Sequence, residues 1–414
     1  MKNILIFIIT LVSILLSVFL PSFYYAGPQF IILLILLSIH SKVERAFLSI
    51  VFWNIVTAII LVLFSFIFAS NGSNWDIVRD ILYLFKVSIG LLIGIHLYYM
   101  KIDISLITKI IVWGALIYVS IYFSSILIYI AKGGEILNLR PQLFRLEFGF
   151  GELIVPFAFI FAYSFGNKVF HKFRFTVLLI LLIQVLLSQS RTALIILLVF
   201  SILTVNNKAN VVSKFLIMFS LYVCIFIIVL VSAFSGMSLD IQANHDSYFA
   251  KLLFSIFEVI PKDYSSKSDV ANHWRGFETF HALNYIANAA PMNIIFGFGA
   301  GARLPLPITM TLAGNDYDSI QFLHNGYLMI MLKSGLVGLF AYLYLCFKFY
   351  RKALILPKRF IELAVIQKSM FWFLILSTSL MAGPFDADDY GGIIILYGYV
   401  FALTKNITSN KMKF

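Results

Sequence analysis

Residues 46–69, AFLSIVFWNIVTAIILVLFSFIFA, form an apolar stretch without a single charged side chain. A stretch of this length can cross the roughly 30 Å hydrocarbon core of a bilayer as an α-helix. Residues 4–20, 213–234 and 363–381 are of the same kind, with few charges. The whole chain is 61% hydrophobic and 12% charged, whereas roughly 25% of the residues in soluble domains are charged. The sequence therefore predicts an all-α, polytopic membrane protein.

We expect about twelve such helices in a single integral membrane domain over residues 1–414. The hydrophobic runs place them near residues 4–20, 28–40, 46–69, 81–99, 105–130, 149–165, 174–188, 192–205, 213–235, 321–346, 363–382 and 391–404. Lys2 precedes the first run, as in a signal peptide, but no small-residue cleavage pattern follows it. We therefore expect this run to be retained as the first helix.

Positive charge marks every second connection between the predicted spans. If the N-terminus is cytoplasmic, the inside connections and the tail carry Lys42, Arg45, Lys168, Lys172, Arg174, Lys208, Lys214, Lys348, Arg351, Lys352, Lys358, Arg359, Lys405, Lys411 and Lys413. Cytoplasmic loops of membrane proteins are enriched in lysine and arginine in this way, so both termini are predicted to be cytoplasmic. The net charge of +12 then reflects orientation in the membrane, and no nucleic acid partner is expected.

The longest connection on the outer face is predicted over residues 236–320. Long connections of this kind are usually functional. Within it, residues 246–260 and 274–287 have apolar side chains at helical spacing. The pattern predicts two amphipathic helices lying on the membrane face.

The outer loop returns to the membrane at residues 324–338, HNGYLMIMLKSGLVG. His324 and Asn325 stand at the head of an apolar helix. They are either a polar pair that caps the helix or a general base and an orienting donor that face an external cleft, since histidine titrates near neutrality. Periodicity does not decide between these two interpretations.

Arginines collect on the predicted outer face, where cations are normally depleted. Residues 188–191, SQSR, form a tight turn between two apolar spans. Its Arg191 either reaches lipid headgroups or holds a phosphate or pyrophosphate, to which a planar guanidinium is well suited. The other outer arginines are Arg140, Arg145, Arg275 and Arg303. Lipid headgroups and a lipid-linked pyrophosphate both fit this set.

Two further motifs are weaker. Residues 296–301, FGFGAG, do not follow a strand, so a nucleotide site is not expected there; either a tight turn that brings backbone amides to a substrate or simple loop flexibility explains the glycines. Asp386, Asp388 and Asp389 have a spacing that suits a divalent cation, but also a solvated acidic loop. We expect no metal site and no cofactor.

Taken together, these motifs resemble the O-antigen polymerase and O-antigen ligase superfamily. The resemblance lies in Ser190 and Arg191 on the tight outer turn and in the glycines of the long outer loop. It also lies in the pair His324 and Asn325, which nine residues separate from Gly335. It implies a membrane glycosyltransferase of C-type architecture with one long periplasmic loop. It also implies that the active site is periplasmic and that the protein lies in the bacterial inner membrane.

The resemblance further implies an undecaprenyl-pyrophosphate-linked oligosaccharide as donor, with no nucleotide sugar. His324 would be the base, Asn325 would orient it or the acceptor, and Arg191 would bind the pyrophosphate. The substrate-binding residues would be Ser190, Arg140, Arg145, Arg275 and Arg303. The resemblance leaves open whether a separate partner protein sets the chain length.

The motifs do not separate a polymerase from a ligase that acts on the lipid A core. We favour a polymerase because the chain is rich in Phe, Ile, Lys and Asn, a composition found in many such polymerases. A lipid-glycan transporter is the main rival, although the two halves of the chain look unlike each other. A scaffold without chemistry is the remaining alternative.

Overall fold

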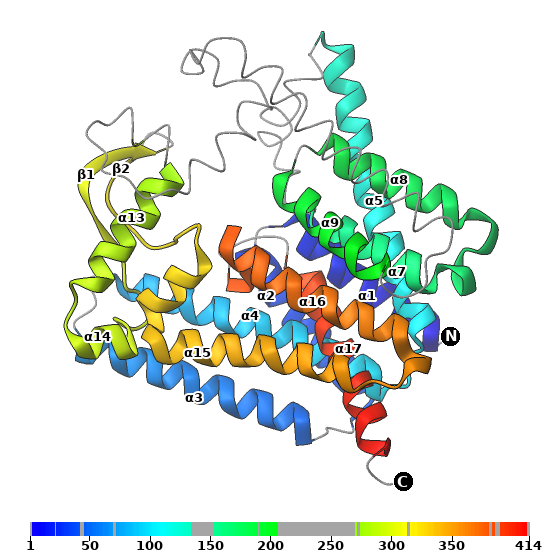
Figure 1. The fold of residues 1–414 in the computed structure, drawn as a ribbon, viewed down its shortest axis with the longest axis horizontal. Helices are drawn as coiled ribbons and strands as arrows, with labels where there is room; N and C mark the ends of the chain where they lie inside the picture. Colours follow the sequence, from blue (N-terminus) through cyan, green and yellow to red (C-terminus); the bar gives the residue numbers. More distant parts are fainter. Residues whose placement is uncertain are drawn as a thin grey trace.

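The computed structural model describes most of the chain, shown in Figure 1. The described residues are 2–20, 22–41, 45–68, 72–133, 152–188, 190–205, 270, 274–312, 315–380, 383–385 and 390–411. They are mostly helical, which confirms a polytopic helical protein. Six of the described helices are long and apolar enough to cross a membrane: α3 (Arg45–Ile67), α4 (Asn74–Tyr99), α5 (Ile104–Ala131), α15 (Gly326–Ile355), α16 (Ile361–Leu380) and α17 (Gly391–Lys411).

Five further helices overlap predicted spans but are shorter than these six helices. They are α1 (Lys2–Phe19), α2 (Ser22–Ile39), α7 (Ile154–Val169), α8 (Arg174–Leu187) and α9 (Arg191–Val205). The predicted span at residues 213–235 lies outside the described residues, as does the predicted amphipathic helix at 246–260. The total of about twelve spans and the periplasmic side of the long loop therefore stay predictions.

The predicted C-terminal ends of two spans were wrong. α15 continues to Ile355 rather than ending at 346, and α17 continues to Lys411 rather than 404. The extra turns of α15 contain Lys348, Arg351 and Lys352, which the hydrophobic pattern predicts to lie in a connecting loop. Lysine and arginine are good helix formers, so a helix can continue past the end of its apolar stretch.

Close packing of α4 on α17 lies at the centre of the bundle. A Cβ atom built on Gly94 of α4 would lie 1.9 Å from the carbonyl oxygen of Ile395, and one built on Gly398 of α17 would lie 2.1 Å from that of Leu91. Small residues at membrane helix interfaces allow backbones to approach in this way. Glycine at both positions is therefore what lets these two helices touch.

The segment before α15 forms a small cap at one end of the bundle (Figure 1). It contains α13 (Trp274–Ala287), α14 (Pro291–Phe296), and an antiparallel pair of strands, β1 (Leu304–Leu312) and β2 (Asn315–Ile320). The bounds of α13 confirm the predicted helix at 274–287. The strands were not expected in an all-α fold. The chain enters at α1 and leaves at α17 at the other end of the bundle (Figure 1).

The apolar face of α13 packs on protein rather than lying open to lipid. Phe277 contacts Met310 of β1, while Ala282 and Ile286 join Leu304 and Leu328 in one buried cluster. The helix is amphipathic, as predicted. Its apolar face covers the hairpin and the start of α15. This packing fixes the position of α13 against the head of α15.

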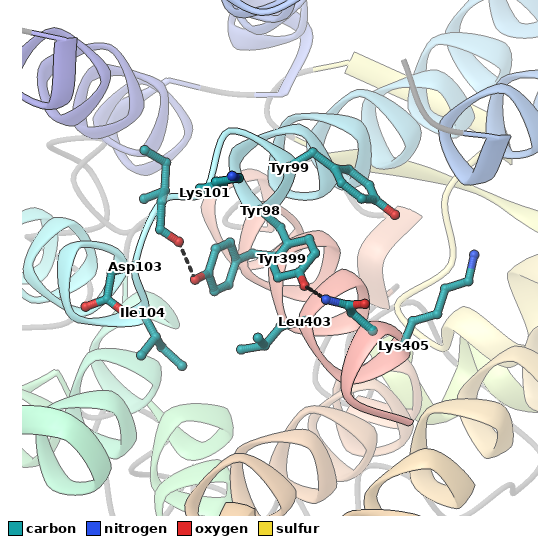
Figure 2. A pocket seen from close by; sticks show the side chains of 10 residues that line it. Tyr98, Tyr99, Lys101, Asp103, Ile104, Tyr399, Leu403 and Lys405 are labelled. Carbon is teal, nitrogen blue, oxygen red and sulfur yellow. Dashed lines mark hydrogen bonds between the residues drawn. The ribbon is translucent and has the colours of Figure 1, made fainter. Parts of the chain in front are cut away.

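A cavity of about 570 Å³ lies at the other end of α4 (Figure 2). It is lined by Tyr98, Tyr99, Lys101, Ile102, Asp103, Ile104, Tyr399, Leu403, Lys405 and Asn406. Since a helix rises about 1.5 Å per residue, the length of α4 separates this cavity from the cap. None of the predicted site residues lies in it.

Candidate functional site

His324 lies in the short connection between β2 and α15, and it is held by one carboxylate of α13. Its Nδ1 atom is 2.8 Å from Oε2 of Glu278. Its backbone N–H donates to the other carboxylate oxygen, Oε1. The side chain of Glu278 is 2% exposed, whereas that of His324 is 50% exposed. A buried carboxylate thus fixes an imidazole that solvent reaches.

Arg275 stands on the same helix, three residues before Glu278. Residues three apart on an α-helix lie on one face, with Cβ atoms roughly 5–6 Å apart. Arg275 is partly exposed and forms no ion pair with any other described residue. α13 therefore carries a predicted anion-binding arginine one helical turn from the carboxylate that binds the predicted base.

Asn325 caps α15. Its Oδ1 accepts hydrogen bonds from the backbone N–H of Tyr327, at 3.1 Å, and of Leu328, at 3.3 Å. These amides belong to the first turn of the helix, which has no internal partners for them. The side-chain oxygen of Asn325 therefore acts as a helix cap, as one of the two interpretations predicts. The role of Asn325 in orienting His324 or an acceptor stays a prediction.

Removal of this cap should have a modest and separable effect. We expect Asn325→Ala to lower the free energy of unfolding by about 1 kcal/mol, since alanine accepts no hydrogen bond, and Asn325→Asp to lower it by less. The thermal midpoint in detergent micelles is the measurement. Equal midpoints for Asn325→Ala and wild type would show that the cap does not stabilise α15.

The serine of the tight turn has a structural partner. Ser190 is buried, its Oγ donates to Oε1 of Glu152 at 2.6 Å, and it accepts from the N–H of Ala193 at 3.3 Å. It therefore caps α9, whose first residue is Arg191. The position of the Arg191 side chain lies outside the described part of the structure, as do Arg140, Arg145, Asp386, Asp388 and Asp389.

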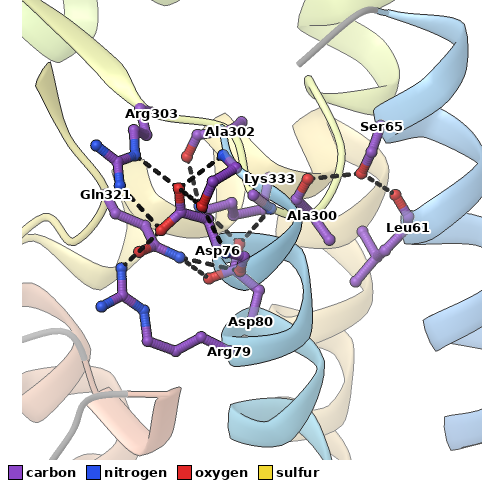
Figure 3. A network of polar contacts seen from close by, with 12 residues as sticks. Leu61, Ser65, Asp76, Arg79, Asp80, Ala300, Ala302, Arg303, Gln321 and Lys333 are labelled. Atoms are coloured by element: carbon purple, nitrogen blue, oxygen red, sulfur yellow. Dashed lines mark hydrogen bonds and ion pairs between the residues drawn. The ribbon is translucent and has the colours of Figure 1, made fainter. Parts of the chain in front are cut away.

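Arg303 belongs to a buried network of charges at the head of α4, drawn in Figure 3. Its Nε and Nη2 atoms lie 2.8 and 3.0 Å from the carboxylate oxygens of Asp76. Arg79 donates to the same carboxylate at 3.0 Å. Asp76 raises the pKa of Arg303 through these hydrogen bonds, so Arg303 stays charged. The guanidinium of Arg303 thus binds a carboxylate of the protein itself. Its contact with a substrate stays a prediction.

A second carboxylate, Asp80, links α4 to three other segments of the chain. Its side chain accepts from Lys333 Nζ at 2.7 Å, from Gln321 Nε2 at 3.0 Å and from the backbone N–H of Gly301 at 2.6 Å (Figure 3). Lys333 also donates to the carbonyl oxygen of Ala302. These contacts join α4, the loop before β1, the end of β2 and α15. No motif in the sequence predicted Asp76 or Asp80 as members of a network.

The glycine run crosses between α3 and α15, and its backbone is used within the protein. Phe298 N–H donates to Leu332 O at 2.9 Å and Gly299 N–H donates to Lys333 O at 3.0 Å. α15 is kinked at Gly335, where φ is +62°, close to these two carbonyls. Ala300 N–H donates to Leu61 O of α3 at 3.1 Å. The amides of Phe298, Gly299 and Ala300 therefore bind backbone carbonyls of the protein, and an approach of this run to a substrate stays a prediction.

Within the described part of the chain, no group of three or more His, Cys, Asp or Glu side chains is arranged to hold a metal ion. The candidate site instead consists of His324, the buried carboxylate of Glu278 and, one helical turn from Glu278, the partly exposed Arg275. That set can accept a proton and can bind an anion.

Comparison with known families finds that residues 176–343 match the family described as Wzy_C, O-antigen ligase. The matched segment runs from α8 into α15 and includes the turn at Ser190, all of α13, the glycine crossing and His324. No curated protein and no solved structure matches the chain. The match confirms the resemblance to the O-antigen polymerase and ligase superfamily.

Proposed function

We propose that this member of the O-antigen polymerase and ligase superfamily is a membrane glycosyltransferase, and specifically an O-antigen polymerase. The observation that carries the proposal is the half-exposed His324, held by buried Glu278 with Arg275 one helical turn away. All three lie within the segment that matches the family. The donor would be a glycan linked to undecaprenyl pyrophosphate, and the acceptor the next lipid-linked repeat unit.

In the proposed reaction, a hydroxyl oxygen of the acceptor sugar attacks the anomeric carbon of the donor. His324 accepts the hydroxyl proton as the new carbon–oxygen bond forms. The bond between the anomeric carbon and the phosphate oxygen breaks, and undecaprenyl pyrophosphate leaves with the electron pair. No metal or other cofactor is needed for this step.

Arginines would stabilise the negative charge that grows on the departing pyrophosphate. Arg275 is one candidate, because it lies one helical turn before Glu278 on α13. Arg191, at the head of α9, is the second candidate, with Arg140, Arg145 and Arg303 as further ones. A forked guanidinium binds two phosphate oxygens at once, which suits it to this task better than lysine.

The proposal also includes a location and a partner. The cap that carries His324 would face the periplasm, and both termini the cytoplasm, in a bacterial inner membrane. A chain-length regulator would act from outside this chain. An O-antigen ligase, which transfers the finished glycan to the lipid A core, is the second candidate because the family match covers both activities.

Glycan ladders from cells that lack the gene and carry variants of it test this proposal. We expect His324→Ala and Arg275→Ala to replace the ladder with a single-repeat product, since loss of a general base alone slows proton transfer by roughly 10²–10⁴-fold. His171→Ala and Arg351→Ala, which alter exposed residues away from the cap, should keep the full ladder.

The same gel separates the alternatives. A bare core in the gene deletion would favour the ligase over the polymerase. An undiminished ladder from both His324→Ala and Arg275→Ala would contradict the glycan-transfer proposal itself. The amount of each variant in the membrane fraction, measured by immunoblot, shows whether a lost ladder reflects lost protein.

A further inference from the structure

Glu278 occupies an unusual position for a carboxylate. It lies on the face of α13 that also buries Phe277 and Ala282, and its side chain is 2% exposed. Burying an ionised carboxylate is unfavourable by several kcal/mol unless hydrogen bonds or charges compensate. Here both oxygens bind a single residue, His324. The compensation therefore comes from the predicted base.

The two hydrogen bonds determine which nitrogen of the imidazole carries the proton. An ionised carboxylate only accepts hydrogen bonds, so Nδ1 of His324 must be the donor across the 2.8 Å contact. In the neutral ring, Nε2 is then the acceptor. The second bond, from the backbone N–H of His324 to Oε1, keeps the carboxylate from rotating away. The ring is thus held in the form that can take up a proton at Nε2.

We propose that Glu278 is a positioning residue for glycan transfer, which holds His324 as the Nδ1-protonated imidazole and balances its charge once Nε2 has taken the proton of the acceptor hydroxyl. This inference rests on the proposed function. It goes beyond that function by naming the residue through which His324 is set to act as a base. Glu278 itself touches neither donor nor acceptor in this proposal.

The glutamine variant separates positioning from packing. Both oxygens of Glu278 accept hydrogen bonds, but glutamine has only one oxygen. If that oxygen keeps the bond from the backbone N–H, the amide group faces Nδ1 and donates to it. The proton then moves to Nε2, which no longer accepts one. Glutamine has the same shape as glutamate, so a merely structural role predicts that Glu278→Gln is the mildest replacement.

We expect the opposite order of activities. With purified full-length protein and a lipid-linked repeat unit, Glu278→Gln should lower kcat at least about hundredfold, as expected for loss of a competent base, with KM changed by less than about threefold. Glu278→Asp keeps two acceptor oxygens on a shorter stem and should recover part of the kcat. In the His324→Ala background, Glu278→Gln should lower the residual rate no further, because it acts through His324.

Three outcomes overturn the inference. One is a wild-type kcat for Glu278→Gln while His324→Ala is inactive, in which case the proposed function stands and the positioning role fails. The second is a loss of kcat in Glu278→Gln and Glu278→Asp that follows the loss of monodisperse protein on size-exclusion chromatography. The third is a further loss on adding Glu278→Gln to His324→Ala. Full polymer from His324→Ala would instead overturn the proposed function.

Discussion

Replacing Gly299 with alanine is expected to abolish the recovery of folded protein from the membrane. Gly299 has φ of +87°, and a Cβ atom there would lie 2.3 Å from the backbone nitrogen of Ser65 and 2.7 Å from the carbonyl carbon of Phe64. Both are backbone atoms of α3, so no side chain can rotate to make room. The Gly299 N–H is also bound to Lys333 O of α15, so the loop cannot move away without breaking that bond.

Gly133 provides the matched control. Its φ is +83°, close to that of Gly299, but a Cβ atom there would meet no atom of the described residues within 4 Å. Gly133→Ala therefore introduces the strain of the left-handed conformation alone, about 1–2 kcal/mol. Fluorescence-detected size-exclusion chromatography of detergent extracts should show a monodisperse peak for Gly133→Ala and none for Gly299→Ala. Similar peaks for both variants would show that the close contact with α3 is not required.

The glycine crossing matters to function because of what it connects. It ties the segment between α14 and β1 to α3 and to the kink of α15. The head of α15 follows His324, and α13 carries Glu278 and Arg275. The distance between the base and the arginine therefore depends on contacts far along the chain. This gives a physical reason for glycines at 297, 299 and 301 that does not involve a ligand.

The helices could be predicted from the sequence because each depends on a local pattern. A long apolar run implies α3 or α5 without knowledge of any neighbour, and the helical spacing in residues 274–287 was enough to give α13 its bounds. The strand pair could not be predicted in the same way. β1 contains Pro305 and Pro307, and its register shifts between Pro305 and Met310. Proline disfavours a strand locally, so the pairing depends on tertiary packing.

The site was predictable only in part for the same reason. His324 and Arg275 were predicted from residue type and position, and in the structure Glu278, one helical turn from Arg275, binds His324. Glu278 was not predicted as a site residue, because charged residues are expected on the polar face of an amphipathic helix. Its place beside Phe277, on the buried face of α13, was the signal that could have identified it. Asp76 and Asp80 were missed because α4 begins at Asn74 rather than at 81. Their spacing of four places both on one helix face.

The second large effect is expected at the buried ion pair between Asp80 and Lys333. The two side chains are each 11% exposed and lie 2.7 Å apart. Removing one partner of a buried pair leaves the other charge uncompensated, which is typically unfavourable by about 3–5 kcal/mol. We therefore expect Lys333→Met and Asp80→Asn each to lower the free energy of unfolding in micelles by about that amount.

The double variant tests whether the lost free energy of unfolding comes from an unpaired charge or from the other hydrogen bonds of Asp80 and Lys333. In Asp80→Asn combined with Lys333→Met no unpaired charge remains, so the loss should be smaller than the sum of the two single losses by about 1–3 kcal/mol. Strict additivity would show that the two residues act independently. Arg79→Gln, at the 28% exposed edge of the same network, should cost about 1 kcal/mol or less. The buried pair of Asp80 and Lys333 joins α4 to α15 where the cap meets the bundle. Lys333→Met and Asp80→Asn should therefore also shorten the glycan ladder, through loss of folded protein. Glu278→Gln should shorten the ladder while the protein stays folded.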